Sequence, residues 1–196
     1  MKEIIFASQN KGKIAEINAL LGPSFKVLGL NDIQFYEETE ETGNTFEENA
    51  KLKAEAVFKF SGKNCFADDS GLSIDVLNGE PGVKSARYAS EKANNEENIV
   101  KVLKELKGKT PAKARFSTCI CLIWNEETFY FEGKAEGEII EEKRGRNGFG
   151  YDPIFIPQNH KRTFAEMSAE EKNKISHRKK AIQKMIAFLA EKSNLI

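Results

Sequence analysis

The stretch Cys65-Phe66-Ala67-Asp68-Asp69-Ser70-Gly71-Leu72 indicates the fold class, because an apolar segment runs here directly into two adjacent carboxylates. Residues 65–67 are predicted to form a short buried strand, and residues 72–76 alternate in polarity as a second strand does. In α/β proteins, ligands bind in a crevice at the ends of strands. We therefore expect Asp68 and Asp69 to lie where a strand ends and to face such a crevice.

Strands and helices alternate on the N-terminal side of this stretch. Residues 4–7 and 25–28 are short apolar runs that are typical of buried strands. Apolar residues recur at helical spacing within residues 13–21, which predicts a helix between the two strands. Thr45-Phe46-Glu47-Glu48 is a capping box, so a further helix is expected to begin there and to end near Ser61-Gly62.

The C-terminal side adds an antiparallel section and further helices. Residues 99–106 predict a helix, and residues 114–124 with 128–131 predict a β-hairpin, with Ile139-Ile140 as a candidate extension of the sheet. Ser168-Ala169-Glu170-Glu171 is another capping box. The last helix carries its apolar face on Ala181, Ile182, Met185, Ile186 and Leu189. Together these patterns predict an α/β protein with a mixed β-sheet and flanking helices.

The bulk composition describes an ordinary globular chain. Its 196 residues suffice for one domain with a substantial core, or for one domain with two lobes. Hydrophobic residues make up 40% and charged residues 31%, within the usual range. The 30 basic and 30 acidic side chains give a net charge of zero, whereas proteins that coat nucleic acid carry a basic excess. We therefore expect no nucleic-acid partner, although a single nucleotide needs only a local basic pocket.

The expected compartment follows from the N-terminal residues and the cysteines. The apolar run at residues 4–7 is too short for the core of a signal peptide and far too short to span a membrane. Cys65, Cys119 and Cys121 are an odd, sparse set that does not form a disulfide framework. We expect free thiols in a reducing cytoplasm and no membrane partner.

Ser8-Gln9-Asn10-Lys11-Gly12-Lys13 lies between a predicted strand and a predicted helix. Backbone N–H groups at a helix N-terminus attract phosphate, and a lysine there adds a positive charge. The GxxxxGK[ST] spacing of a P-loop is missing. Taken alone, the segment suits a phosphate site and an ordinary capped turn equally well.

Two groups of acids are candidates for metal chemistry: Glu40 with Glu41, and Asp68 with Asp69. The glutamates alone match a solvated surface loop. Adjacent aspartates after an apolar strand repel each other unless a cation or a proton intervenes. Magnesium would relieve this repulsion, since it prefers one or two carboxylates together with substrate phosphates.

The third candidate region contains glycines and aromatic residues. Gly145-Arg146-Asn147-Gly148-Phe149-Gly150-Tyr151-Asp152-Pro153 does not follow the dinucleotide-binding order of glycines. Glycine allows an aromatic ring to approach a base closely, although a loop with Phe149 folded into the core fits the pattern equally well. Lys172, His177 and Arg178 follow, across a predicted break between helices, and together they suit recognition of an anion or a base edge.

These motifs together resemble the Ham1/inosine-triphosphatase family, the XTP/dITP diphosphatases, over nearly the whole chain. Each motif is weakly specific alone, whereas six in the same order are very specific. The chain departs from many relatives at Gln9, where they have glycine, and a side chain there narrows the approach to the phosphates. In chain order the motifs are Ser8 to Lys13, Glu41-Thr42-Gly43-Asn44-Thr45-Phe46-Glu47-Glu48-Asn49-Ala50 with Lys53, Ala67 to Leu72, Ser85-Ala86-Arg87-Tyr88, Gly148 to Pro153, and Ser176-His177-Arg178.

The resemblance implies an elongated, two-lobed α/β fold, one Ham1-like domain over residues 1–196, with the nucleotide in the cleft between the lobes. It also implies Mg²⁺ as cofactor, a homodimer, and cleavage of the bond between the α- and β-phosphates of XTP, ITP or dITP. By resemblance, Asp69 is the general base and a metal ligand, and Glu41 is the other ligand, with Glu40 as the alternative if the register shifts by one. Asp68 would tune Asp69 or hold a water.

The remaining roles also follow from the resemblance. Arg178 is a donor only, so it matches the 6-oxo acceptor of hypoxanthine and xanthine and opposes the 6-amino donor of adenine. Phe149 is the candidate for stacking on the base. The substrate-binding set is Ser8, Gln9, Asn10, Lys11, Gly12, Lys13, Lys53, Ser70, Phe149, Gly150, Tyr151, Asp152, Lys172, His177 and Arg178.

Two other functions remain open at this stage. One is a Maf-like pyrophosphatase of other modified nucleotides, against which the Ser-His-Arg and Gly-Phe-Gly-Tyr-Asp motifs argue. The other is a non-catalytic nucleotide sensor, which would have no need of Glu41 and Asp69 as a metal-bound base.

Overall fold

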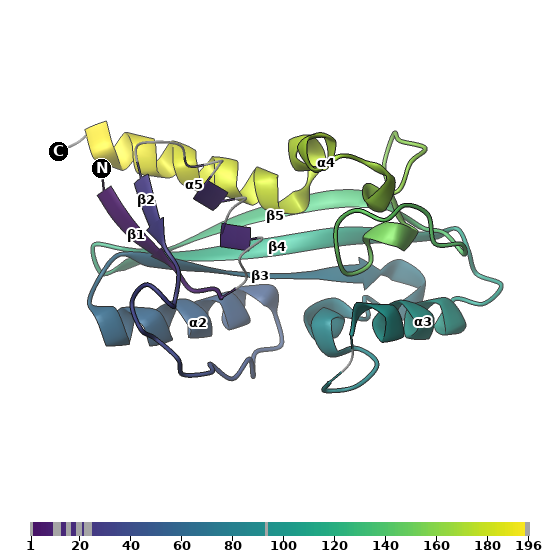
Figure 1. The fold of residues 1–196 in the computed structure, drawn as a ribbon, viewed down its shortest axis with the longest axis horizontal. Helices are drawn as coiled ribbons and strands as arrows, with labels where there is room; N and C mark the ends of the chain where they lie inside the picture. The colour runs from purple at the N-terminus through teal and green to yellow at the C-terminus, as the bar shows by residue number, and fades with distance from the viewer. Residues whose placement is uncertain are drawn as a thin grey trace. The chain divides into compact units, whose positions relative to one another are not determined.

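The computed structural model describes residues 2–9, 13–14, 17–18, 21, 25–92 and 94–194. These residues form an α/β protein with a mixed β-sheet and flanking helices, which confirms the predicted fold class (Figure 1). The described strands lie in the order β2-β1-β3-β4-β5-β6. Their bounds are Lys2–Phe6 (β1), Phe25–Leu28 (β2), Cys65–Ile74 (β3), Ala112–Trp124 (β4), Glu127–Ile139 (β5) and Phe155–Pro157 (β6).

The sheet combines parallel and antiparallel pairs. β1 pairs in parallel with β2, where Ile4 is aligned with Val27, and also in parallel with β3. β6 pairs antiparallel with β5. Asn125 and Glu126 connect β4 to β5 and both have positive φ, as a two-residue hairpin turn requires. The predicted hairpin is therefore confirmed, although β5 continues well beyond the residues that alternation alone marked.

Two of the helices begin where the predicted capping boxes place them. α2 spans Phe46–Ser61, α3 spans Asn95–Glu105, α4 spans Ala169–Ile175 and α5 spans His177–Asn194. The capping boxes at Thr45 and Ser168 are both formed, with side chain and backbone bonded in each direction. The predicted helix after Lys13 is helical at residues 13, 14, 17, 18 and 21, and its other positions lie outside the described residues.

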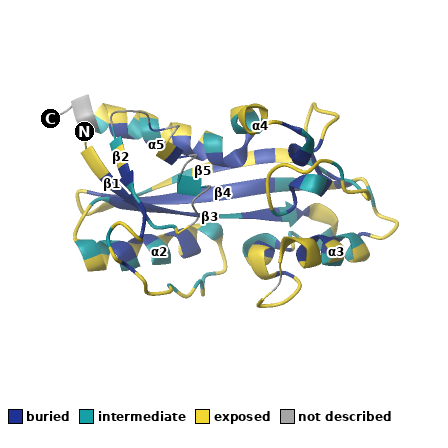
Figure 2. Cartoon of the chain, viewed as in Figure 1, coloured by how far each residue is buried: buried dark blue, intermediate teal, exposed yellow. Residues whose placement is uncertain are grey.

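The chain divides into two compact units. Unit 1 comprises Met1–Asp69, Thr118–Glu132 and Lys180–Ile196, and unit 2 comprises Ser70–Ser117 and Gly133–Lys179. β3, β4 and β5 contribute residues to both units. Each unit has its own buried apolar core, as the dark strands of Figure 2 show.

The core of unit 1 has two layers because side chains alternate across the strands. Ile4 and Phe66 face the cluster that contains the buried positions of α5. Ile5 and Cys65 face the opposite cluster, against Ala50, Ala54 and Val57 of α2. The predicted apolar face of the last helix is confirmed, since Ala181, Ile182, Met185 and Leu189 are fully buried.

Unit 2 packs α3 and the following strands around one cluster. Ile99, Val102 and Leu106 are buried in this cluster, which confirms the predicted helix. Phe116 contacts Phe155 edge to face, with ring centroids 4.7 Å apart. Such aromatic pairs add to the stabilisation that burial provides.

One expectation about the acidic stretch is wrong. β3 is a single strand from Cys65 to Ile74, so Asp68 and Asp69 lie within it and not at its end. The strand continues because lysine side chains neutralise both carboxylates, so the pair does not need to turn into solvent. Val76, predicted to continue the alternation, lies in a short 3₁₀ helix and is 46% exposed.

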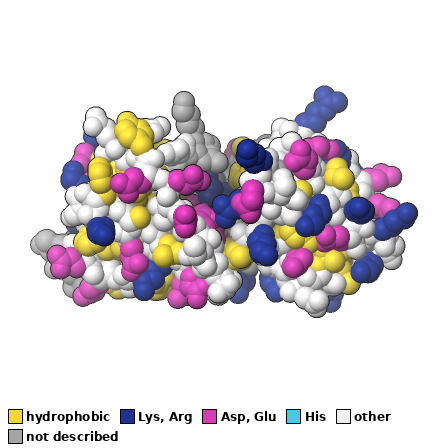
Figure 3. Space-filling view, turned by 90° about the horizontal axis from the view of Figure 1, so that it is seen from below, with side chains coloured by type: hydrophobic (Ala, Val, Ile, Leu, Met, Phe, Trp, Pro, Cys, Tyr) yellow, Lys and Arg dark blue, Asp and Glu magenta, His cyan; other side chains and the backbone are white. Residues whose placement is uncertain are grey.

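No helix among the described residues is long and apolar enough to cross a membrane. Lysine and arginine side chains lie among aspartates and glutamates across the face that Figure 3 shows. Charges of both signs therefore mix on that face, in keeping with the net charge of zero.

Candidate functional site

Asp69 of β3 is held by two residues from one face of α2. Asn49 and Lys53 are four residues apart, so their side chains lie one above the other on the helix. The Asn49 Nδ2 donates to Asp69 Oδ2 at 3.2 Å, and the Lys53 Nζ lies 3.5 Å from Asp69 Oδ1. Asp69 is 8% exposed and Asn49 is 1% exposed, so this carboxylate sits largely away from water with both oxygens directed at named partners.

Lys53 also binds Glu41, which comes from the loop before α2. The Lys53 Nζ donates to Glu41 Oε1 at 2.7 Å. Burial alone would lower the pKa of Lys53, but the carboxylates of Asp69, Asp68 and Glu41 raise it above its usual value. Lys53 therefore remains charged and brings Glu41 and Asp69 toward one point. Glu40, the alternative to Glu41, is exposed, so the geometry favours Glu41.

Asp69 has a pKa above its usual value. Burial is the main cause, opposed by the charge of Lys53 and the hydrogen bond from Asn49, while Glu41 and Asp68 raise the pKa further. A carboxylate whose pKa is raised accepts a proton more readily than an exposed one. Such a perturbed group is typical of a functional position.

Asp68 and Lys13 form a second ion pair beside the first. The Lys13 Nζ lies 2.9 Å and 3.0 Å from the two carboxylate oxygens of Asp68, which is 3% exposed. Ser8, Gln9, Lys13, Glu41, Lys53 and Asp68 all line one cavity of about 570 Å³ within unit 1. The structure thus brings the described part of the predicted phosphate segment, Glu41 and Asp68 to one cavity. Asp69 does not line this cavity but contacts Lys53, which does. Asn10, Lys11 and Gly12 lie outside the described residues.

Glu41 and Asp69 fit a magnesium ion better than a metal held by protein alone. No group of three His, Cys, Asp or Glu side chains within the described ranges could hold a metal. Magnesium usually takes only one or two carboxylates and completes its shell with water and phosphate oxygens. Glu41 and Asp69 already share one ammonium group, so they converge where a positive charge is held. The donor set therefore fits Mg²⁺.

A second group of predicted residues assembles in unit 2 around Phe149. The Phe149 N–H donates to Asp152 Oδ2 at 2.9 Å, and Lys172 pairs with the same carboxylate. Gly148 has φ +77°, and a Cβ there would lie 2.0 Å from Asp152 Oδ2, so only glycine allows this turn. Asp152 is 2% exposed and thus orders the loop from within.

The ring of Phe149 lies beside two cations and is half exposed. Its centroid is 4.9 Å from Lys172 Nζ and 5.8 Å from the guanidinium carbon of Arg178. Phe149 is 51% exposed, so the alternative of a core residue does not hold. An open aromatic face bordered by hydrogen-bond donors suits a base that carries acceptor oxygens.

Four other predicted residues occupy different surroundings. Tyr151 is buried, its hydroxyl donates to the Ser85 carbonyl at 2.8 Å, and burial raises its pKa. His177 is buried and stacks on Phe116 with centroids 5.0 Å apart. Ser70 is half-buried in β3, and Gly150 has φ +59°. For these residues substrate contact stays a prediction.

Sequence reasoning did not single out Asn49. It appeared only as one letter of a motif, because a helical asparagine is commonly a surface residue. Its position immediately after a capping box and four residues before Lys53 is the signal that points to the site.

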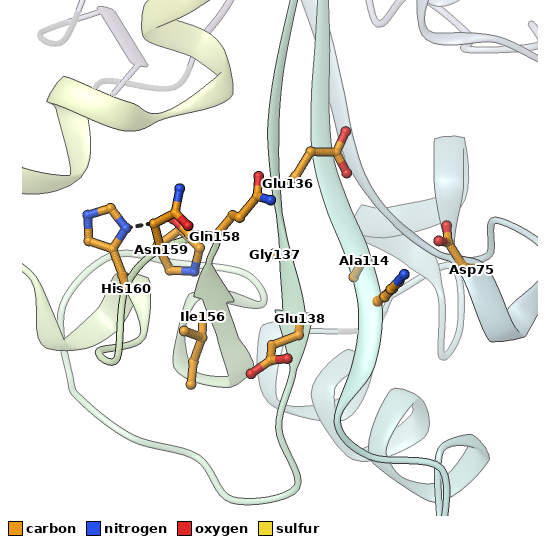
Figure 4. Close-up of a pocket in the computed structure, with 11 residues that line it drawn as sticks. Asp75, Ala114, Glu136, Gly137, Glu138, Ile156, Gln158, Asn159 and His160 are labelled. Carbon is orange, nitrogen blue, oxygen red and sulfur yellow. Dashed lines mark hydrogen bonds between the residues drawn. The ribbon is translucent and has the colours of Figure 1, made fainter.

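A different cavity of unit 2 contains none of the predicted site residues. It has a volume of about 460 Å³ and opens beside β5 and β6 (Figure 4). The Gln158 carbonyl contacts His160 Nδ1 at 2.9 Å on its wall, and Asp75 is already paired with Arg115. Two of its polar side chains, His160 and Asp75, thus already have partners.

The fold and the two residue groups define a class: an α/β protein with a carboxylate-and-lysine cavity suited to phosphate chemistry and a separate aromatic-cationic group suited to a base. Comparison with known proteins makes this specific. Residues 4–188 match the sequence profile of the Ham1 family, so the chain belongs to that family.

Individual relatives agree with this assignment. A protein of Bacillus subtilis strain 168 named "dITP/XTP pyrophosphatase" is 53% identical over 193 residues, which cover 96% of this chain and 98% of that protein. A protein of the same name from Flavobacterium psychrophilum is 51% identical over 186 residues, covering 95% and 98%. The solved structure of the Staphylococcus aureus Ham1 protein superposes with a TM-score of 0.91 at 46% identity, covering 97% of this chain and 100% of that one.

Proposed function

We propose that this chain hydrolyses the non-standard purine nucleoside triphosphates XTP, ITP and dITP to the nucleoside monophosphate and pyrophosphate, with Mg²⁺ as cofactor. Membership of the Ham1 family and relatives named dITP/XTP pyrophosphatase support the substrate class and the reaction. The observation that carries the site is the buried Asp69, which shares the ammonium group of Lys53 with Glu41 beside a cavity.

In this proposal Asp69 is the general base. It takes a proton from a water directed at the α-phosphorus, and its raised pKa makes it a stronger base than an exposed aspartate. Lys13 and Lys53 exchange their carboxylate partners for phosphate oxygens and hold the triphosphate. Catalysis of this type depends on positioning and charge neutralisation more than on a covalent nucleophile. A cavity lined by Lys13, Lys53 and the buried Asp68, with the buried Asp69 in contact with Lys53, suits it.

Glu41 and Asp69 are the residues that would hold Mg²⁺. When bound, the ion neutralises charge on the phosphate oxygens and on the pyrophosphate that leaves. Before substrate binds, Asp68 keeps Lys13 at the cavity through its two-oxygen contact, which phosphate oxygens then replace.

The residues of unit 2 select the base. Phe149 stacks on the purine, and Arg178, 4% exposed, donates to the 6-oxo group. Adenine would present a donor to a donor, which leaves both unpaired and costs about 1–3 kcal/mol. Asp152 and Lys172 support the ring of Phe149 through the contacts that order its loop.

One experiment tests the reaction. ITP and Mg²⁺ are incubated with the protein in water enriched in oxygen-18, and the products are separated and weighed by mass spectrometry. We expect IMP and pyrophosphate in equal amounts, with the label in IMP because water attacks the α-phosphorus. IDP with orthophosphate would contradict the reaction, and tight ITP binding without turnover would favour a nucleotide sensor.

The substrate panel distinguishes the Maf-like alternative. Modified pyrimidine triphosphates should be poor substrates beside ITP and XTP if the aromatic-cationic group reads a 6-oxo purine. We further propose a homodimer, on the family resemblance alone, and multi-angle light scattering of the purified chain measures it directly.

A further inference from the structure

Asn49 joins two parts of the phosphate-side site through one side-chain amide. Its Oδ1 accepts the N–H of Gly43 at 2.8 Å, and its Nδ2 donates to Asp69 Oδ2 at 3.2 Å. Gly43 follows Glu41 by two residues, and Asp69 lies on β3. The same amide therefore contacts the loop that carries one acid and the strand that carries the other.

The loop before α2 is built to allow this contact. A Cβ at Gly43 would lie 2.6 Å from Glu48 Cβ and 2.7 Å from Asn49 Oδ1, so any side chain there would push the loop away. The next two backbone donors, those of Asn44 and Thr45, both bind Glu48 Oε2. Three consecutive N–H groups are thus hydrogen-bonded to the first turn of α2. These bonds hold in place the loop backbone that follows Glu41.

The asparagine amide serves both contacts at this position. An amide side chain offers an acceptor and a donor, which match the Gly43 N–H and the Asp69 carboxylate. Aspartate would keep the first contact but would set a second negative charge against Asp69. Reversing the amide would oppose donor to donor at Gly43 and acceptor to carboxylate at Asp69.

We propose that Asn49 is a positioning residue of the reaction: it fixes the orientation of the Asp69 carboxylate and the placement of Glu41, so that the two acids converge on one cation. This inference rests on the proposed function. Asn49 acts through Glu41 and Asp69 and need not touch the substrate. Outer partners of metal-binding acids typically change metal affinity or activity about 10–100-fold when removed.

The chain contains a matched control in unit 2. Asn98 is also the fourth residue of its helix, also follows a capping box, and is 2% exposed where Asn49 is 1% exposed. Its Oδ1 accepts the Ala89 N–H at 2.8 Å, and its Nδ2 donates to the Ala86 carbonyl at 3.0 Å. Asn98 therefore makes the same kind of bridge, but both of its partners are backbone groups.

The test compares Asn49→Ala, Asn49→Asp and Asn98→Ala with the unaltered protein. For each we would measure kcat and KM for ITP, Mn²⁺ affinity by calorimetry without nucleotide, and the midpoint of thermal unfolding. We expect both Asn49 variants to lose about 10–100-fold in kcat and Asn49→Ala to lose Mn²⁺ affinity similarly, with little change in KM. Asn98→Ala should lower the unfolding midpoint and leave kcat and Mn²⁺ affinity unchanged.

The outcomes separate this inference from the proposed function. If the unaltered protein makes no pyrophosphate from ITP, the proposed function fails, and the Mn²⁺ affinities still decide whether Asn49 organises the two acids. If Asn49→Ala and Asn98→Ala lower the unfolding midpoint alike and neither changes kcat or Mn²⁺ affinity, Asn49 is structural and the inference is overturned. Full activity of Asn49→Asp would also overturn it, because that variant retains only the loop contact.

Discussion

The N-termini of α2 and α3 have nearly the same structure but serve two purposes. We call each N-terminus, with its capping box and the asparagine that follows, the entrance of its helix. Each helix begins with a capping box, in which Glu48 N donates to Thr45 Oγ1 at 3.1 Å and Glu97 N donates to Asn94 Oδ1 at 3.0 Å. Each box is followed at once by a buried asparagine. At α3 the asparagine Nδ2 donates to a backbone carbonyl, whereas at α2 it donates to the Asp69 carboxylate.

The difference lies in what the second partner can do. A backbone carbonyl is a fixed acceptor, so the α3 bridge stabilises a turn and nothing more. A carboxylate can exchange a proton and bind a cation, and its charge depends on the groups around it. The same local motif therefore becomes part of a site when the neighbouring strand supplies an acid. In the proposed function, unit 1 contributes the groups that act on phosphates, which all the nucleotides share, and unit 2 contributes the groups that contact the base.

The largest effect should follow from changing the acid that distinguishes the α2 entrance. Asp69→Asn removes the base and a metal ligand while keeping the shape of the side chain, so we expect kcat for ITP to fall by at least 10²–10⁴-fold, roughly the contribution of a general base. Steady-state kinetics measure the loss, and circular dichroism checks that the fold remains. Near-normal turnover would remove Asp69 from the reaction.

A smaller and more selective effect should follow in unit 2. Arg178→Ala should lower kcat/KM for ITP and XTP far more than for ATP, because the 6-oxo purines lose charge-assisted hydrogen bonds worth about 1.5–3 kcal/mol each that the 6-amino group of adenine never makes. GTP carries the same 6-oxo group, so ATP is the nucleotide that decides the comparison. Competition assays with the four nucleotides measure the ratios. A uniform loss across all four would instead assign Arg178 to the triphosphate and would break the division between the units.

Much of this comparison was predictable from the sequence, and the reason lies in periodicity. The caps at Thr45 and Ser168, the buried face of α5 and the acidic pair on β3 all follow from local spacing. The continuity of β3 could not be predicted from local spacing. Repulsion between Asp68 and Asp69 suggested that the strand ends there, but ion pairs with Lys13 and Lys53 remove this repulsion.

The candidate site was predictable mainly where a residue type is chemically conspicuous. Glu41, Asp69 and Lys53 stand out as charges near a strand, and they do lie together. Asn49 was missed because its position after a capping box and four residues before Lys53 does not by itself reveal its contact with Asp69, which lies 20 residues away in the chain. The surroundings of Tyr151 and His177 likewise depend on distant partners, Ser85 and Phe116.

The two caps themselves should contribute equally, which sharpens the contrast between the asparagines. Thr45→Ala and Asn94→Ala each remove one side-chain acceptor from a helix N-terminus, so each should lower the free energy of unfolding by about 1 kcal/mol. Urea denaturation monitored by circular dichroism measures both losses. A much larger loss for Thr45→Ala would mean that the α2 entrance also differs in its cap, and not only in the partner of its asparagine.

The smallest expected signal is the reactivity of the thiols, and it reports on unit 1 alone. Cys65, Cys119 and Cys121 are all buried and all belong to unit 1. Burial raises the pKa of each thiol to about 12. At pH 8 almost no thiolate is present in the folded protein, whereas an unfolded cysteine with a pKa of about 8.5 is roughly one-quarter ionised. Folded protein should therefore resist a disulfide reagent such as DTNB, and protein unfolded in guanidinium should titrate all three cysteines.

The same reagent distinguishes the two asparagines without any substrate. Cys65 and Cys121 lie in the cluster that α2 covers, together with Ala50 and Val57. If the Asn49 bridge fastens the start of α2 to β3, Asn49→Ala should open this cluster more often and should react faster under native conditions. Asn98→Ala loosens a helix of unit 2, which contains no cysteine, so its rate should match that of the unaltered protein. An equal rise in the rate of thiol reaction in both variants would mean that the two helix N-termini open together. The two N-termini would then belong to one cooperative unit and would not open independently.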